Sequence, residues 1–325
     1  LWSNVLTGSL PTELGLLTAM DNLQLSNNQL SGVIPSELGQ LSNMTVLYLF
    51  SNVLTGSLPT ELGLLTAMED LSVGDNQLSG VLPSELGQLS STTTLYLWSN
   101  VLTGSLPTEL GLLTTMEELG LYENQLSGVI PSELGQLSSI TYLGLLSNAM
   151  TGSLPTELGL LSAMESLSLR DNELSGFIPS DIGELSKIRD LRLQRNQLRG
   201  VIPSAVGHLT SMSKLDLFSN ALTGSLPSEL GLLTALTDLR LGENQLMGSL
   251  PTQLGGLSSL ERFNLSHNSF TGTIPSEVVL LANASLERMS IEGTDLTGIL
   301  SEEMCSVSFW GPCPAFMDCS ACLVI

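Results

Sequence analysis

Acidic residues are the side chains whose spacing comes closest to a catalytic arrangement in this chain. Two sets recur 48 residues apart: Glu69, Asp70 and Asp75, then Glu117, Glu118 and Glu123. Paired carboxylates serve as general acid and base only where their surroundings separate their pKa values. Both sets flank a short apolar alternation typical of a solvent-facing strand, where carboxylates stay hydrated. We therefore predict no enzyme activity, no cofactor and no metal site, and expect these acids to attract basic peptide groups or Ca²⁺.

Charge is spread unevenly along the chain. The formal net charge is −22, and no Lys or Arg precedes Arg170, whereas 15 of the 32 acids lie in the first 169 residues. A surface of this sign repels nucleic acid and anionic lipid, so neither is expected as a partner. Solubility is the simplest reason for such a charge, and a cationic partner is the alternative.

A 24-residue repeat must position these side chains. Proline keeps this period from Pro11 to Pro275, and glycine keeps it from Gly8 to Gly272. A fixed period of this length predicts a solenoid of stacked turns. Asparagine shows the same register without a slip, at Asn4, Asn28, Asn52, Asn76, Asn100, Asn124, Asn148, Asn172, Asn196, Asn220, Asn244 and Asn268.

The stretch Met20–Asn43 shows what each position does. Leu23 and Leu25 flank Gln24, a period-two pattern that predicts a short strand with one buried face. Asn28 follows the strand, where a side-chain amide can satisfy buried backbone donors and acceptors. Turns stacked about 4.8 Å apart would form a parallel sheet, a continuous leucine core and a ladder of asparagine amides.

Glycine and proline occupy the corners of the same unit. Gly32 and Gly39 suit tight corners where a Cβ would clash, and Pro35 fixes φ in an extended segment. The complete pattern, L-x-x-L-x-L-x-x-N-x-L-x-G-x-I-P-x-x-L-G-x-L, resembles the plant-type class of leucine-rich repeats. This class occurs in plant receptor-kinase ectodomains, polygalacturonase-inhibiting proteins and algal proteins. The resemblance implies an α/β-type right-handed solenoid with few regular helices, whose short parallel strands line a concave face.

The repeat pattern and the cysteines suggest two segments. Residues 1–300 form the predicted solenoid of about 12–13 repeats, without an N-terminal cap, so we expect the natural protein to begin earlier. Residues 301–325 form a predicted C-terminal cap that holds the cysteines. Disulfides are the favoured interpretation, three pairings are possible, and zinc is the weaker alternative. The cap cysteines are Cys305, Cys313, Cys319 and Cys322.

Disulfides would place the protein outside the cell or on the outer face of the plasma membrane. Three Asn-x-Ser/Thr acceptor patterns agree with export, at Asn43, Asn264 and Asn283. The sequence contains no apolar run of 18 residues, so membrane attachment would need a segment outside it.

Aromatic side chains occupy outward strand positions rather than the leucine positions. They are Tyr48, Phe50, Tyr96, Trp98, Tyr122 and Tyr142. Strand propensity and repeat duplication could account for them, but an exposed aromatic patch usually marks a binding site. Gly120 and Gly144 stand between them and predict a low floor that a ligand could approach, with Leu146 beside it. The predicted contact set is completed by Glu117, Glu118 and Glu123.

Arginines form a second outward stripe at Arg170, Arg189, Arg192 and Arg195. Pairing with Asp171 and Asp190 would explain them, and docking of a carboxylate or sulfate group is the alternative. Some plant peptide receptors hold a ligand's carboxyl end with an R-x-R pair. This chain departs from that pattern, so the role is not transferred.

Together these features predict an extracellular module that recognises a protein or peptide through its concave face. Two alternatives remain open. Planar aromatics also stack on sugars, which would give a wall-polysaccharide binder, and near-identical repeats suit a structural component of a surface layer or filament. Ice binding is a weaker prediction, based on the regular threonines Thr7, Thr55, Thr103 and Thr151.

Overall fold

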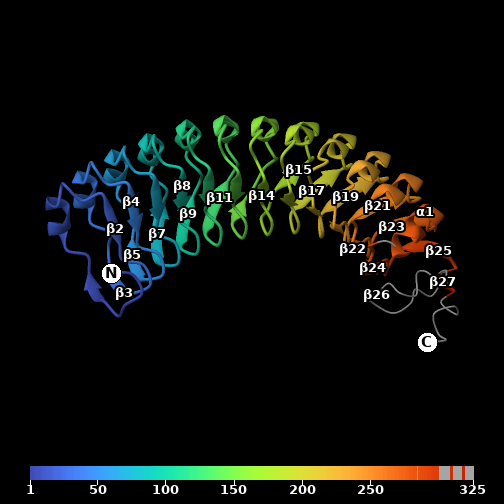
Figure 1. The fold of residues 1–325 in the computed structure, drawn as a ribbon, viewed down its shortest axis with the longest axis horizontal. Coiled ribbons are helices and arrows are strands. Elements are labelled where there is room, and N and C mark those ends of the chain that lie inside the picture. Colours follow the sequence, from blue (N-terminus) through green and yellow to red (C-terminus); the bar gives the residue numbers. More distant parts are fainter. Residues whose placement is uncertain (284, 300–307, 310–316, 319–325) are drawn as a thin grey trace. The chain divides into compact units, whose positions relative to one another are not determined.

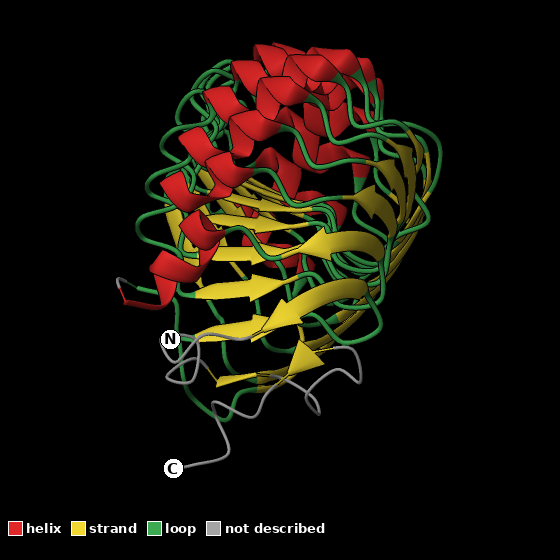
Figure 2. Ribbon diagram, turned by 90° about the vertical axis from the view of Figure 1, so that its right-hand side faces the viewer, coloured by secondary structure: helices red, strands yellow, loops and turns green. Residues whose placement is uncertain are grey.

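The computed structural model describes residues 1–283, 285–299, 308–309 and 317–318. The chain comprises two compact units, Leu1–Met164 and Glu165–Ile325. Both are built from stacked turns in which strands occupy two sides and short helices a third (Figures 1 and 2). The predicted single solenoid over residues 1–300 and its C-terminal cap remain predictions. The four cysteines lie outside the described residues.

The first unit has two parallel ladders. One ladder contains the strands whose leucines are buried and whose intervening residues project outward; we call it the first strand face. Its strands are β2 (Asn22–Gln24), β4 (Val46–Tyr48), β6 (Asp70–Ser72), β8 (Thr94–Tyr96), β10 (Glu118–Gly120) and β12 (Tyr142–Gly144). The other ladder comprises β1 (Thr7–Ser9), β3 (Gln29–Gly32), β5 (Val53–Gly56), β7 (Gln77–Val81), β9 (Val101–Gly104), β11 (Gln125–Gly128) and β13 (Ala149–Met150).

The second unit repeats this arrangement. Its second strand face comprises β14 (Ser166–Ser168), β16 (Asp190–Arg192), β18 (Lys214–Asp216), β20 (Asp238–Arg240), β22 (Arg262–Asn264), β24 (Arg288–Ser290) and β26 (Ser308–Phe309). Its other ladder comprises β15 (Ser175–Gly176), β17 (Gln197–Gly200), β19 (Ala221–Gly224), β21 (Gln245–Gly248), β23 (Ser269–Thr273), β25 (Asp295–Ile299) and β27 (Met317–Asp318).

One short helix per turn closes the third side, and in most turns it is a 3-10 helix. The first unit contains η1 (Thr12–Leu16), η2 (Ser36–Gln40), η3 (Thr60–Leu64), η4 (Ser84–Gln88), η5 (Thr108–Leu112), η6 (Ser132–Gln136) and η7 (Thr156–Leu160). The second unit contains η8 (Ser180–Glu184), η9 (Ser204–His208), η10 (Ser228–Leu232), η11 (Thr252–Gly256), α1 (Ser276–Val279) and η12 (Leu280–Asn283).

The prolines and glycines act at these helices as predicted. Pro35 has φ −67° and ψ 135° and precedes η2, where its missing N–H removes no helical hydrogen bond. A Cβ on Gly39 would lie 2.7 Å from Cβ of Glu61 in the next turn. Neighbouring turns can therefore stack this closely only because residue 39 has no side chain.

Leucines and asparagines hold the turns together. Leu47 and Leu49 have no exposed surface, which confirms that the leucine positions build the core. Asn52 donates through Nδ2 to the carbonyls of Leu25 and Leu49, and its Oδ1 accepts from the Leu30 N–H at 2.9 Å. Each amide thus satisfies backbone groups of its own and the preceding turn. The predicted asparagine ladder is confirmed.

Candidate ligand-binding surface

The first strand face carries the predicted aromatic side chains outside the core. Tyr96 and Trp98 are half-buried, whereas Leu95 and Leu97 on either side have no exposed surface. The same alternation holds for the other predicted aromatic and aliphatic contacts, all half-buried: Tyr48, Phe50, Tyr122, Tyr142 and Leu146. The repeat therefore places these side chains on the surface, as the period-two pattern predicts.

The rings support one another. Trp98 and Tyr122 stack with centroids 5.7 Å apart and ring planes 6° from parallel, and Tyr48 lies 6.0 Å from Phe50 in a tilted pair. Rings held by neighbours lose little freedom when a ligand binds, so such a patch is preorganised.

The prediction of an open glycine floor is wrong. A Cβ on Gly120 would lie 2.7 Å from Cδ1 of Tyr96, and one on Gly144 would lie 2.8 Å from Cζ of Tyr142. Both glycines are buried beneath these tyrosine rings. They therefore accommodate the protein's own aromatics, and a ligand would meet rings rather than backbone at Gly120 and Gly144. Spacing along the sequence does not reveal which way a ring tilts.

Trp98 also covers a glycine, Gly74, which was not among the predicted contact residues. A Cβ on Gly74 would lie 2.6–2.8 Å from three atoms at the centre of the indole. One face of the indole thus covers Gly74, and the other stacks on Tyr122. The indole presents its edge to solvent.

Carboxylates border the rings. Tyr48 donates through its hydroxyl to Oδ2 of Asp70 at 3.3 Å, and Tyr96 donates in the same way to Glu118. Glu117 and Glu123 are exposed. Burial raises the pKa of Tyr48, and the charge of Asp70 raises it further. Burial likewise raises the pKa of Tyr122, together with the charge of Glu123.

The second strand face carries charges in place of rings. Asp190, Lys214 and Asp238 are register partners across β16, β18 and β20. The next outward row alternates in the opposite order: Arg192, Asp216 and Arg240. The sequence contains this checkerboard at its central strand positions, but only Asp190 and Arg192 of it were among the predicted pairs.

Ion pairs neutralise most of this checkerboard. Nε of Arg192 lies 2.9 Å from both carboxylate oxygens of Asp190, and Arg240 lies 2.8 Å from Asp238. Asp171 accepts a hydrogen bond from Arg195 and forms an ion pair with Arg170. The predicted pairing with Asp171 and Asp190 is confirmed for Arg170, Arg192 and Arg195, whereas Arg189 pairs with Glu165 instead.

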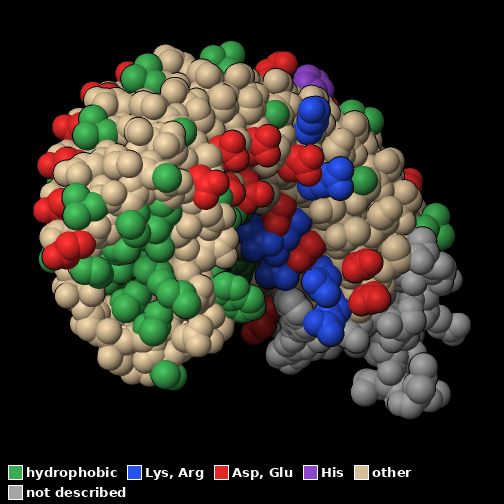
Figure 3. Space-filling model, turned by 60° about the vertical axis from the view of Figure 1, so that its left-hand side comes forward, with side chains coloured by type: hydrophobic (Ala, Val, Ile, Leu, Met, Phe, Trp, Pro, Cys, Tyr) green, Lys and Arg blue, Asp and Glu red, His purple; other side chains and the backbone are tan. Residues whose placement is uncertain are grey.

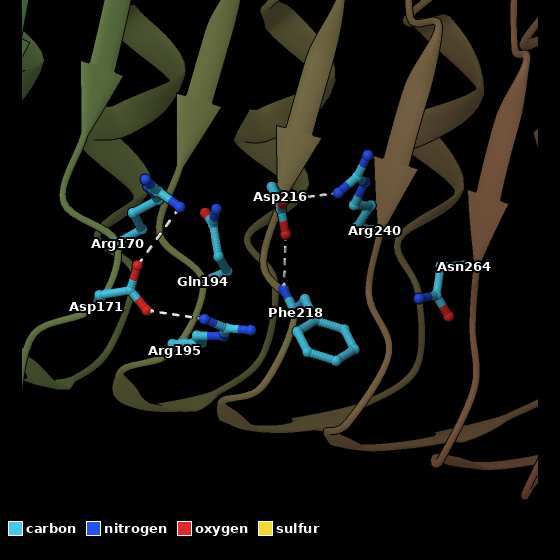
Figure 4. Close-up of a pocket in the computed structure, with 8 residues that line it drawn as sticks. All are labelled: Arg170, Asp171, Gln194, Arg195, Asp216, Phe218, Arg240 and Asn264. Carbon is cyan, nitrogen blue, oxygen red and sulfur yellow. Dashed lines mark hydrogen bonds and ion pairs between the residues drawn. The ribbon is translucent and has the colours of Figure 1, made fainter. Parts of the chain in front are cut away.

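A pocket of about 290 Å³ opens on the second strand face (Figure 4). Its lining residues are Arg170, Asp171, Gln194, Arg195, Asp216, Phe218, Arg240 and Asn264. Asp216 is only 2% exposed, and burial raises its pKa, while the Phe218 N–H and the charge of Arg240 act in the opposite direction. Figure 3 shows Lys and Arg side chains gathered beside Asp and Glu side chains on the surface.

The predicted glycosylation sites differ in accessibility. Asn43 is exposed, and its Nδ2 donates to the carbonyl of Thr18. Asn264 is 9% exposed and its Oδ1 accepts from the backbone N–H and the hydroxyl of Ser266, so the folded chain leaves no room for a glycan there. The side chain of Asn283 lies outside the described residues. Among the described residues, no helix has the length and apolar character needed to cross a membrane.

Comparison with known proteins agrees with this architecture. A model described as leucine-rich repeat region matches residues 124–294, and a leucine-rich-repeat model matches residues 20–41. The crystal structure of a TDR receptor is 36% identical, with a TM-score of 0.89, over 94% of this chain and 53% of that one. The chain belongs to the plant-type leucine-rich-repeat family.

Two further structures show the range of this fold. The plant peptide hormone receptor RGFR1, solved in complex with RGF2, is 32% identical over 95% of this chain and 57% of that chain, with a TM-score of 0.69. A plant ice-binding protein is 27% identical over 85% of this chain and 81% of that chain, with a TM-score of 0.60. The chain thus spans just over half the length of the two receptors. No curated protein sequence matches it.

Proposed function

We propose that the chain is an extracellular recognition module that binds a peptide or protein segment on the first strand face. The observation that carries this proposal is the preformed cluster of Tyr96, Trp98 and Tyr122, whose rings are half-exposed and fixed by their neighbours. Rigid aromatic side chains contribute large contact area at low entropic cost, which is typical of binding hot spots. The fold shared with a peptide hormone receptor supports the same class of function.

The orientation of Trp98 favours a peptide over a sugar. A sugar ring stacks on an open aromatic face, but the two faces of this indole lie against Gly74 and Tyr122. An indole whose two faces are covered offers its edge to a partner, which suits a peptide carbonyl beside an aliphatic side chain. The geometry therefore argues against the carbohydrate alternative at this position.

The border of acids defines the ligand further. Glu117 and Glu123 are exposed beside the rings, and the first 169 residues contain no Lys or Arg to pair with them. A ligand with Lys or Arg next to an apolar or aromatic residue satisfies both features. Charge attraction of this kind raises the association rate and weakens as salt screens it.

The experiment is selection of peptides from a random displayed library on the intact chain. We expect enrichment of sequences that combine a basic and an aromatic or branched residue. The double variant Trp98→Ala/Tyr122→Ala should weaken the selected peptides at least about 30-fold, because hot-spot aromatics contribute about 2 kcal/mol or more.

Phe177→Ala is the matched control, since Phe177 is 61% exposed but lies outside both strand faces. Peptides that bind the double variant and the wild type equally, or whose affinity ignores ionic strength, would refute the proposal.

A further inference from the structure

The pocket on the second strand face contains buried polar atoms that pairing of the arginines leaves without a partner. Its first end is formed by Arg170, Gln194 and Arg195, from the turns that follow β14 and β16 (Figure 4). Phe218 forms part of the wall, and Arg240 and Asn264 continue the lining across later turns. The volume of about 290 Å³ holds one or two side chains rather than a large ligand.

Two polar atoms at this end have no partner within the protein. Nε of Arg170 and Oε1 of Gln194 are buried and make no hydrogen bond. A buried donor and a buried acceptor without partners each lower the stability of the fold. A bound group that offers an acceptor to Arg170 and a donor to Gln194 would remove both penalties.

Charge at the same end is incompletely balanced. Arg170 and Arg195 share the single carboxylate of Asp171, at 3.5 and 3.3 Å. Elsewhere on this face the pairing is tighter, as for Arg240 with Asp238 at 2.8 Å. The two guanidinium groups therefore carry one positive charge more than their common carboxylate neutralises.

Lys214 lies on the same strand face, and its pKa is lowered. Burial lowers the pKa of Lys214, and the charges of Arg192 and Arg240 lower it further, against the opposing effect of Asp238 and Asp190.

We propose that this pocket binds an acidic residue within a peptide segment, with an apolar neighbour packed against Phe218. The side-chain carboxylate accepts from Nε of Arg170 and from the guanidinium of Arg195. A peptide N–H of the same residue donates to Oε1 of Gln194. The carboxylate supplies the missing acceptor and negative charge, and the amide supplies the missing donor. This site is independent of the aromatic patch and of the function proposed for it.

The test is an NMR titration of the intact chain, read on the arginine Nε–Hε signals. The probe is the blocked dipeptide acetyl-Asp-Leu-amide, and acetyl-Asn-Leu-amide is the uncharged analogue. We expect the Arg170 signal to shift and saturate with the first probe and to stay unchanged with the second. Saturation by both probes alike, or by sulfate at equal concentration, would overturn the assignment to a carboxylate.

Three variants locate the site. Arg170→Gln should weaken the acidic probe about tenfold or more, as expected when a charge-assisted hydrogen bond is lost. Asp171→Asn should strengthen it about fivefold, because the competing carboxylate is gone. Asn also suits the left-handed backbone at this position, where φ is 54°. Phe218→Ala should weaken the probe about threefold. Unchanged affinity in Arg170→Gln, or weaker binding in Asp171→Asn, would overturn the proposal.

Two controls separate this site from other effects. Arg189→Gln removes an arginine whose side chain is 68% exposed and paired with Glu165 outside the pocket, so the probe should bind it as it binds wild type. Trp98→Ala should also leave the affinity unchanged. Loss of probe binding in Trp98→Ala would contradict the independence of the two sites.

Discussion

Equivalent strand positions carry different chemistry in the two units. In the first, the outward position of β8 is Tyr96, and its register partner on β10 is Gly120, which the ring covers. In the second, Asp216 and Arg240 are the corresponding partners on β18 and β20. The backbone, the leucines and the asparagine ladder are shared. Recognition chemistry in this fold is therefore a property of the outward side chains, which the scaffold does not constrain.

The two faces also satisfy their polar groups differently. The acids of the first face have no basic residue within their unit, so Tyr48 and Tyr96 hydroxyls bind Asp70 and Glu118. The acids of the second face pair with arginine or lysine, both within a strand, as for Asp190 with Arg192, and across neighbouring strands, as for Asp238 with Arg262. The first face keeps negative charge available for a partner, whereas the second uses most of its charge internally.

Removing an acid should distinguish the faces most strongly. Asp238 and Glu118 occupy the same strand position, but Asp238 is 4% exposed and contacts Arg240, Lys214 and Arg262. Asp238→Asn leaves these cations under-compensated and should lower the free energy of unfolding by about 3 kcal/mol. Glu118→Gln should lower it by less than about 1 kcal/mol. Urea unfolding measures both, and equal losses would remove the distinction between the faces.

The shared scaffold should respond alike in both units. Asn100 accepts from the Leu78 N–H and donates to two carbonyls, and Asn244 makes the equivalent bonds. Asn100→Ala and Asn244→Ala each leave buried backbone groups unpaired and should each cost about 2–3 kcal/mol in urea unfolding. A difference above about 1.5 kcal/mol between them would show that the ladders are not equivalent.

Gly120 should matter for stability because a tyrosine ring covers it. Gly120→Ala places a Cβ 2.7 Å from the Tyr96 ring, so the ring must shift, at a cost of about 1–2 kcal/mol in unfolding free energy. Ser168 occupies the same strand position in the second unit, and its buried hydroxyl lacks a partner. Ser168→Ala should change stability by less than about 0.5 kcal/mol. A neutral Gly120→Ala variant would contradict the covering role of Tyr96.

Alkaline pH should affect the first unit, which contains all four tyrosines. The folded pKa values of Tyr48 and Tyr122 are raised above 10.0. The unfolded chain therefore releases these protons first, and their stabilising contribution, complete below pH 10, is lost as pH rises through the folded pKa values. Tyr48→Phe/Tyr122→Phe should reduce this loss, as measured by urea unfolding between pH 9 and 11. An unchanged slope would contradict the raised pKa values.

Sequence periodicity predicted the scaffold well because each position has one physical role. Asn52 makes the backbone hydrogen bonds predicted for the asparagine position, and Pro35 has the extended dihedral angles predicted for the proline position. The glycine floor failed because side-chain tilt depends on neighbours in other turns, as Tyr96 over Gly120 illustrates. The pairing of Asp216 with Arg240 required knowledge of which turns lie in register. The 24-residue repeat supplies that register, which places Asp216 and Arg240 side by side on neighbouring strands.

The central claim is that recognition takes place on the rings of the first strand face. Hydroxyl-radical footprinting of the chain, with and without a library-selected basic peptide, tests it directly. The account predicts protection of Tyr96, Trp98 and Tyr122 and unchanged labelling of Phe177. Protection confined to Phe218 and the rest of the second unit would contradict it.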